Sequence, residues 1–178
     1  MSTMTKFLGP PLKDSFRDFY GFDDEKCEQA VKYYREYYTT KGIFENRVYD
    51  GVEECLKKLS EAGLHLAVAT SKPQVFAVKI LEHFHLAQYF DYIGGAELDG
   101  SRSVKADVIV HTLKNCGVND RSQVIMAGDR YHDVLGAKAL GIDCIGMLYG
   151  YGTREELSQA GAVYIAETPL EAAKWLLG

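Results

Sequence analysis

Short apolar segments alternate with helical patterns from Leu64 to the end of this chain of 178 residues. Such alternation is typical of a parallel sheet whose strands are connected by helices that lie on both faces. The sequence therefore predicts an α/β fold over most of its length. We expect the strands, all short and apolar, at residues 64–70, 89–95, 123–128, 144–150 and 162–166.

The first fifty residues carry helical signals and no strand-like apolar segment. Asp23 and Asp24 are candidate N-caps of a helix that runs to about Lys41. Tyrosines at positions 33, 34, 37 and 38 form two adjacent stripes on this helix, and we expect them to pack within the unit rather than to stack on a substrate ring. The chain is thus divided into a helical subdomain at residues 1–50 and an α/β core at residues 51–178.

Two helix starts near the carboxyl end have clear local signals. Thr153 with Glu156 matches a capping box, in which each side chain binds the backbone N–H of the other residue. Thr168 followed by Pro169 predicts the start of the last helix.

The charge pattern and the apolar runs exclude several classes of protein. A net charge of −5 with interspersed acidic and basic residues gives no basic stripe, so nucleic acid is not an expected partner. No apolar run approaches the roughly 20 residues that span a bilayer, and the first residues lack a secretion signal. We expect a cytoplasmic protein with no membrane partner. The four cysteines are far apart without a CxxC pair, which indicates reduced core thiols.

Polar side chains lie at the carboxyl ends of predicted strands and at the start of a helix that follows one of them. Parallel sheets bind ligands at this edge. Thr70, Ser71 and Lys72 end one strand, so hydroxyls and backbone N–H groups there can hold a phosphate oxygen. Lys105 lies close to the start of a later helix, where it can neutralise a phosphate. The alternatives are that the hydroxyls only cap a helix and that the lysine is a solvated surface residue.

The segment Gly-Asp-Arg-Tyr-His-Asp at residues 128–133 places two carboxylates directly after a third strand. Mg²⁺ prefers oxygen ligands and usually takes only one or two protein carboxylates. Asp129 suits direct ligation of Mg²⁺, and Asp133 can orient a ligand or water. The alternative for Asp133 is that it only caps the helix that follows.

A hydroxyl at one strand end, a lysine further on and GDxxxD at a later strand end resemble three of the four motifs of the haloacid dehalogenase superfamily. LAVATSKP, GDRYHDVLGAKALGIDCIGMLYGYGT and KFLGPPLKDSF are similar to its phosphoglycolate-phosphatase-like branch. The resemblance implies a Rossmann-like core with a partial helical cap, and Mg²⁺-dependent hydrolysis of a small phosphorylated metabolite such as phosphoglycolate or a nucleoside monophosphate. It implies that Thr70 and Lys105 are catalytic, that Thr70, Ser71, Lys72 and Lys105 bind substrate, and that Asp129 and Asp133 serve the metal.

The family's first motif, a strand ending in DxDGT that supplies the nucleophilic aspartate, has no match in this sequence. Asp14 and Asp18 are rejected as nucleophiles because no apolar strand precedes them and no Gly-Thr follows. In this family the missing strand is the central one, between the strands that end at Thr70 and Gly128. Its absence predicts unpaired strand edges and self-association.

Three explanations of this departure are open. The natural polypeptide can begin upstream, which we favour because KFLGPP joins the family pattern within the cap. The flanking strands can instead pair directly, or another chain can supply the strand. We expect the protein to be a phosphatase and the given chain to be inactive. The alternative is a non-catalytic phosphate-binding or interaction protein derived from the same fold, with phosphomutase or dehalogenase chemistry at low weight.

Overall fold

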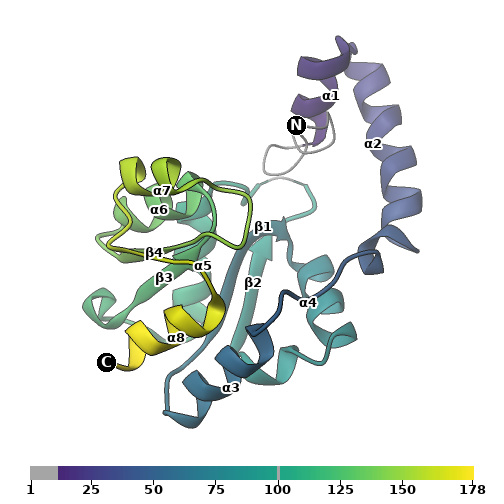
Figure 1. Ribbon diagram of the computed structural model, residues 1–178. Helices are drawn as coiled ribbons and strands as arrows, with labels where there is room; N and C mark the ends of the chain where they lie inside the picture. Colours follow the sequence, from purple (N-terminus) through teal and green to yellow (C-terminus); the bar gives the residue numbers. More distant parts are fainter. Residues whose placement is uncertain (1–11, 100) are drawn as a thin grey trace. The chain divides into compact units, whose positions relative to one another are not determined.

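A computed structural model of the chain describes residues 12–99 and 101–178 (Figure 1). The chain forms two compact units, Met1–Arg47 and Val48–Gly178. The family resemblance also implies that Phe7 to Leu12 lie near the cavity, and apart from Leu12 these residues are outside the described part.

The first unit contains α1 (Leu12–Tyr20), α2 (Asp24–Tyr38) and the 3₁₀ turn η2 (Gly42–Phe44). Asp23 is the N-cap of α2, where its side chain accepts a hydrogen bond from Lys26 N, as predicted. Cys27 and Ile43 are fully buried between these elements. The tyrosines of the stripe do contact their own unit, since Tyr37 Oη donates to Glu45 and the Tyr37 ring lies against Gly42, although three of the rings remain 40% to 61% exposed. These are Tyr33, Tyr34 and Tyr37, with Tyr34 stacked on Tyr38.

In its described residues the second unit contains five parallel strands, which confirms the α/β prediction. Each lies within or close to a predicted segment, although the first begins three residues later than expected, at Ala67, and continues past Thr70 with an irregular register. The strands are β1 (Ala67–Pro73), β2 (Tyr92–Ala96), β3 (Ile125–Gly128), β4 (Asp143–Met147) and β5 (Tyr164–Ala166).

Within residues 48–99 and 101–178, six helices and two short turns connect and cover these strands. Thr168 accepts a hydrogen bond from Glu171 N, so the predicted cap of the last helix is confirmed. None of the helices in the described ranges is long and apolar enough to span a bilayer. The elements are α3 (Val52–Glu61), α4 (Gln74–His83), η3 (Ala87–Tyr89), α5 (Lys105–Asn115), η4 (Arg121–Gln123), α6 (Tyr131–Lys138), α7 (Arg154–Ala160) and α8 (Pro169–Leu177).

Successive residues of β4 divide the core into two layers, because side chains alternate between the faces of a strand. Cys144 packs in a cluster with residues of α5, α6 and α7. Ile145 and Met147 pack in a second cluster with Ala172 of α8. On that second side α3 packs against α8 (Figure 1). Helices therefore cover both faces of this sheet, as the sequence predicts.

The strands form two sheets, β1-β2 and β3-β4-β5, and within residues 12–99 and 101–178 no backbone pairing joins β1 to β3. Leu66 O accepts from Asp91 N, so the alternating carbonyls turn Ala69 O away from β2, toward the unpaired edge. Ala69 and Met126 nevertheless pack against the same buried cluster, so one core serves both sheets. This break lies where the sequence predicts a missing central strand.

Candidate functional site

Lys105 lies across the break between the two sheets. It begins α5, and its Nζ donates to Ala69 O of β1 over 3.0 Å. The same Nζ lies 2.8 Å from Asp133 Oδ1 at the start of α6, and the lysine side chain is only 13% exposed. Its stem lies against Gly136, where an added Cβ would stand 2.6 Å from Lys105 Cγ. The alternative of a solvated surface lysine is therefore wrong.

Asp133 has two partners, one on each carboxylate oxygen. Oδ1 pairs with Lys105, and Oδ2 accepts from Arg130 N over 3.1 Å, which caps the first turn of α6. The two roles that the sequence left as alternatives, helix cap and part of a charged site, thus coexist. Gly128 permits the close approach, because a Cβ there would stand 2.3 Å from Asp133 Cβ.

Asp129 follows β3 and is enclosed by the loop between β4 and α7. Its Oδ2 accepts a hydrogen bond from Tyr151 N over 2.8 Å. Added Cβ atoms at Gly150 and Gly152 would stand 2.2 Å from Asp129 Oδ2 and 2.1 Å from Asp129 O. Within the described ranges no residue donates a hydrogen bond to Asp129 Oδ1. This oxygen is therefore open to a ligand, while the other fixes the orientation of the carboxylate.

Thr70, Ser71 and Lys72 lie together where β1 ends. Thr70 directly follows Ala69, whose carbonyl binds Lys105, and its Oγ1 accepts from Lys72 N over 3.2 Å. Ser71 and Lys72 are exposed. A series of contacts therefore runs from Ala69, beside Thr70, through Lys105 to Asp133. Asp133 in turn binds the backbone N–H of Arg130, which directly follows Asp129.

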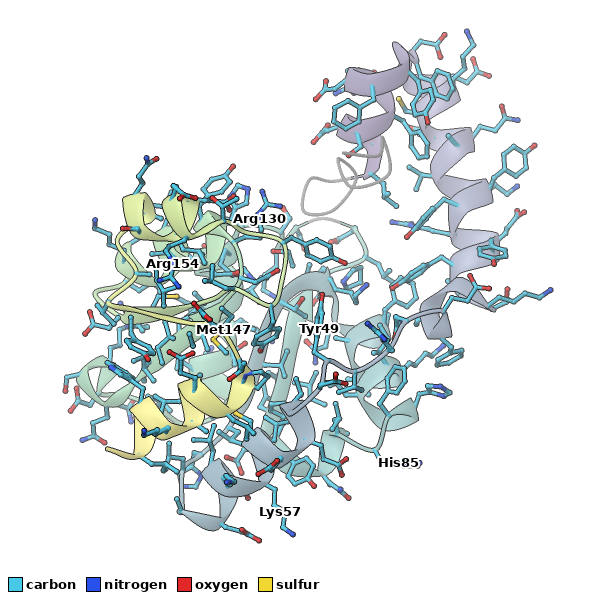
Figure 2. All side chains as sticks on the ribbon, in the orientation of Figure 1. Tyr49, Lys57, His85, Arg130, Met147 and Arg154 are labelled. Atoms are coloured by element: carbon cyan, nitrogen blue, oxygen red, sulfur yellow. The ribbon has the colours of Figure 1, made fainter. Side chains whose placement is uncertain are left out.

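Arg130 and Glu156 belong to the same constellation, and sequence reasoning gave neither a place in the site. Thr153 accepts from Glu156 N as predicted, but the capping box is only half formed because the Glu156 carboxylate turns elsewhere. Glu156 Oε1 accepts from Arg130 Nε over 2.8 Å and from Tyr131 N over 2.9 Å. Arg130 is labelled among the side chains in Figure 2. Burial opposes ionisation of Glu156, but the two hydrogen bonds together with the nearby positive charge of Arg130 hold the pKa of the carboxyl below its usual range.

The carboxylates of this site provide part of the oxygen ligands that a hard cation such as Mg²⁺ needs. Within the described ranges no group of three or more His, Cys, Asp or Glu side chains is arranged to hold a metal ion. Mg²⁺ does not require such a group, because one or two carboxylates commonly hold it together with water and substrate phosphate. The open Oδ1 of Asp129 satisfies that minimum, and Asp133 lies one helical turn further along the chain.

The profile of the haloacid dehalogenase-like hydrolase family matches residues 1–147. A 5'-nucleotidase from Pseudomonas aeruginosa is 45% identical over 157 residues, which are 88% of this chain and 71% of the relative. The tyrosine-protein kinase PtkA of Mycobacterium tuberculosis is 38% identical over 90% of this chain. A phosphoglycolate phosphatase of Pseudomonas savastanoi is 31% identical over 84%. The chain spans about half, 54%, of each of these last two relatives.

A similar solved structure is that of a predicted phosphatase from Clostridium acetobutylicum. Its TM-score is 0.90 at 49% sequence identity, and the match covers 98% of this chain and 81% of that chain. These findings confirm the resemblance that the three motifs indicated and the fold class that it implied. The chain belongs to the haloacid dehalogenase-like hydrolase family.

Proposed function

We propose that this chain is the larger part of a Mg²⁺-dependent phosphomonoesterase. The observation that carries the proposal is the position of Lys105, whose ammonium group contacts both the end of β1 beside Thr70 and the carboxylate of Asp133. A cation held there at low exposure stabilises phosphate charge strongly, because little water screens it.

In this proposal Thr70 Oγ1 and the backbone at the end of β1 bind the phosphoryl oxygens, with Ser71 and Lys72 at the exposed entrance. Lys105 steadies the phosphate and the attacking carboxylate. Asp129 Oδ1 holds the metal, and Asp133 keeps Lys105 and the Asp129 loop in place. Mg²⁺, when bound, neutralises charge that develops on the transferring phosphoryl group.

The attacking carboxylate is the part that the 178 residues do not supply. An aspartate nucleophile divides hydrolysis into formation and breakdown of an aspartyl-phosphate, and charge stabilisation alone does not replace that route. In this proposal a strand that carries such an aspartate pairs with β1 and β3, which have no pairing with each other in the described residues. We therefore propose that the chain given does not turn over by itself.

The substrate in this proposal is a small phosphate ester. A nucleoside monophosphate is favoured over phosphoglycolate, since the relative named 5'-nucleotidase is 45% identical and the relative named phosphoglycolate phosphatase is 31% identical. Sequence charge and the lack of an apolar span in the sequence favour a cytoplasmic small-molecule enzyme over one that acts on nucleic acid or at a membrane.

A second candidate function is phosphate binding without chemistry. The observation in its favour is that Lys105, Asp133 and Asp129 already have ordered protein partners although no nucleophile motif is encoded. A site of this kind can recognise a phosphate and carry out no hydrolysis.

The test compares this chain with one extended upstream by a strand ending in Asp-x-Asp-Gly-Thr. Release of phosphate from p-nitrophenyl phosphate, nucleoside monophosphates and phosphoglycolate is measured with and without Mg²⁺. We expect turnover only in the extended chain with Mg²⁺, and loss of turnover on Asp129→Asn. Phosphate binding without turnover in both chains would favour the second function. Robust turnover by the short chain, abolished by Asp129→Ala, would show that the nucleophile is assigned wrongly.

A further inference from the structure

Glu156 has a fixed backbone and an inward-turned side chain. It lies in the first turn of α7, where its N–H donates to Thr153 Oγ1 over 3.1 Å. Its side chain is 25% exposed, although three of the four residues before it are exposed. A carboxylate that only capped its own helix would bind the backbone of Thr153. The Glu156 carboxylate instead accepts a hydrogen bond from the backbone N–H of Tyr131, 25 residues earlier in the chain.

One oxygen of Glu156 holds the segment directly after Asp129. Arg130 Nε and Tyr131 N both donate to Glu156 Oε1. The remaining backbone donor of this turn, Arg130 N, is held by Asp133 Oδ2. Two consecutive N–H groups after Asp129 are therefore bound to carboxylates from two different helices, which leaves the turn little freedom.

The same helix start also anchors the loop on the other side of Asp129. That loop runs from β4 to the N-cap Thr153 and donates Tyr151 N to Asp129 Oδ2. Gly152 packs on the backbone carbonyl of Asp129 so closely that an added Cβ would stand 2.1 Å away. Because Glu156 ties α7 to Arg130 and Tyr131, it sets the distance between the two loops that enclose Asp129.

We propose that Glu156 is a positioning residue for the Asp129 carboxylate, acting through Arg130, Tyr131 and the loop that carries Tyr151. The inference rests on the proposed function in which Asp129 Oδ1 holds a divalent cation. Groups that orient a metal-binding carboxylate commonly change metal affinity by about 10- to 100-fold when they are removed.

A purely stabilising role for Glu156 is the competing explanation. The Arg130 and Glu156 side chains are 31% and 25% exposed, and pairs that water reaches contribute little to the free energy of unfolding. The proposal therefore predicts a large effect on the Asp129 loop beside a small effect on global stability, and this separates it from the alternative.

The experiment uses the 178-residue chain labelled with ¹⁵N, with Mn²⁺ as the probe. Amide exchange at Tyr131 and Tyr151 is measured first, and Mn²⁺ titration then gives an affinity from the broadening of amide signals in residues 128–133. Thermal unfolding of every variant checks the fold. The variants are E156A, E156Q, Arg130→Met and the control Glu155→Ala, an exposed carboxylate in the same helical turn.

We expect E156A to speed exchange at both amides and to weaken Mn²⁺ binding by about 10-fold or more. E156Q keeps an oxygen that accepts both hydrogen bonds, so it should restore most of the protection and affinity. Arg130→Met removes one of the two donors and should give a smaller loss, which tests the proposal even if E156A does not fold. Glu155→Ala should match the unaltered chain.

Wild-type exchange at Tyr151 and unchanged Mn²⁺ affinity in folded E156A would overturn the inference. E156Q behaving as badly as E156A would also overturn it, because both hydrogen bonds would then be irrelevant. If the unaltered chain shows no Mn²⁺ broadening, the metal site of the proposed function is wrong, while exchange at Tyr151 still decides whether Glu156 positions Asp129.

Discussion

Lys105 Nζ lies 2.8 Å from Asp133 Oδ1, and the two side chains are 13% and 10% exposed. The two residues lie in the first turns of consecutive helices, α5 and α6, which pack on one core beside the break between the sheets. The pair thus fixes the position of β1, which Lys105 contacts, relative to the helix that follows β3. It also concentrates opposite charges where we propose that phosphate and metal bind.

Replacing Lys105 with Met should destabilise the chain by about 3 to 5 kcal/mol, because Asp133 would keep a buried charge without its partner. Adding Asp133→Asn removes that unpaired charge, so the double variant should recover part of the loss. Urea unfolding followed by circular dichroism measures both. Lys114→Met on the exposed side of the same helix is the control and should stay within about 0.5 kcal/mol. Equal stability of K105M and the unaltered chain would contradict a buried pair.

Gly150→Ala should disturb Asp129 directly, because the added Cβ would stand 2.2 Å from Asp129 Oδ2. We expect a loss of about 1 to 3 kcal/mol in stability from this overpacking, and weaker Mn²⁺ binding. The matched control is Tyr151→Ala, which removes a 58% exposed side chain but keeps the N–H that binds Asp129. A control that loses Mn²⁺ as strongly as Gly150→Ala would mean that the side chain, rather than the backbone, fixes the carboxylate.

Local signals in the sequence predicted the elements well, because caps and apolar periodicity depend on neighbouring residues. Thr153 and Thr168 cap the helices that they were expected to start. The sequence also placed Asp129 directly after a strand, and β3 does end at Gly128. The burial of Lys105 was not predictable in the same way, because its contacts Ala69 and Asp133 are distant in sequence.

Glu156 shows why the rest of the site escaped sequence reasoning. The capping-box pattern predicts that this carboxylate binds the backbone of Thr153. In the folded chain it instead accepts hydrogen bonds from Arg130 and Tyr131. A local pattern does not reveal such a competition, because it depends on which distant donors the fold brings within reach. The Gly-Tyr-Gly sequence at residues 150–152 was the available signal, since closely spaced glycines often mark a close backbone approach.

The open edges of β1 and β3 should make the 178-residue chain associate with itself at high concentration. Sedimentation velocity over a range of concentrations measures this. Ala67→Pro should reduce association, because the backbone of Ala67 faces away from β2 and loses no pairing there. Val68→Pro is the control, since its backbone faces β2 and the substitution should destabilise the sheet. A concentration-independent monomer with a sharp unfolding transition would contradict the prediction.

Stability should fall in acid through Glu171, which lies in the first turn of α8. Tyr164 Oη donates to Glu171 Oε1 over 2.6 Å and Glu167 N donates to Oε2 over 2.9 Å. These bonds hold the pKa of Glu171 below its ordinary 4.5. The unfolded chain therefore takes up the proton first as pH falls below 4.5, so this stabilisation is complete above 4.5 and disappears as pH falls through the folded pKa.

Glu171→Gln should accordingly lower the urea midpoint at pH 7, and the difference from the unaltered chain should close as pH falls below 4.5. Glu155→Gln is the control, because Glu155 is an exposed carboxylate in the first turn of α7. Its midpoint should follow that of the unaltered chain at every pH. A gap between Glu171→Gln and the unaltered chain that stays constant down to pH values well below 4.5 would mean that the substitution acts through packing rather than through the charge.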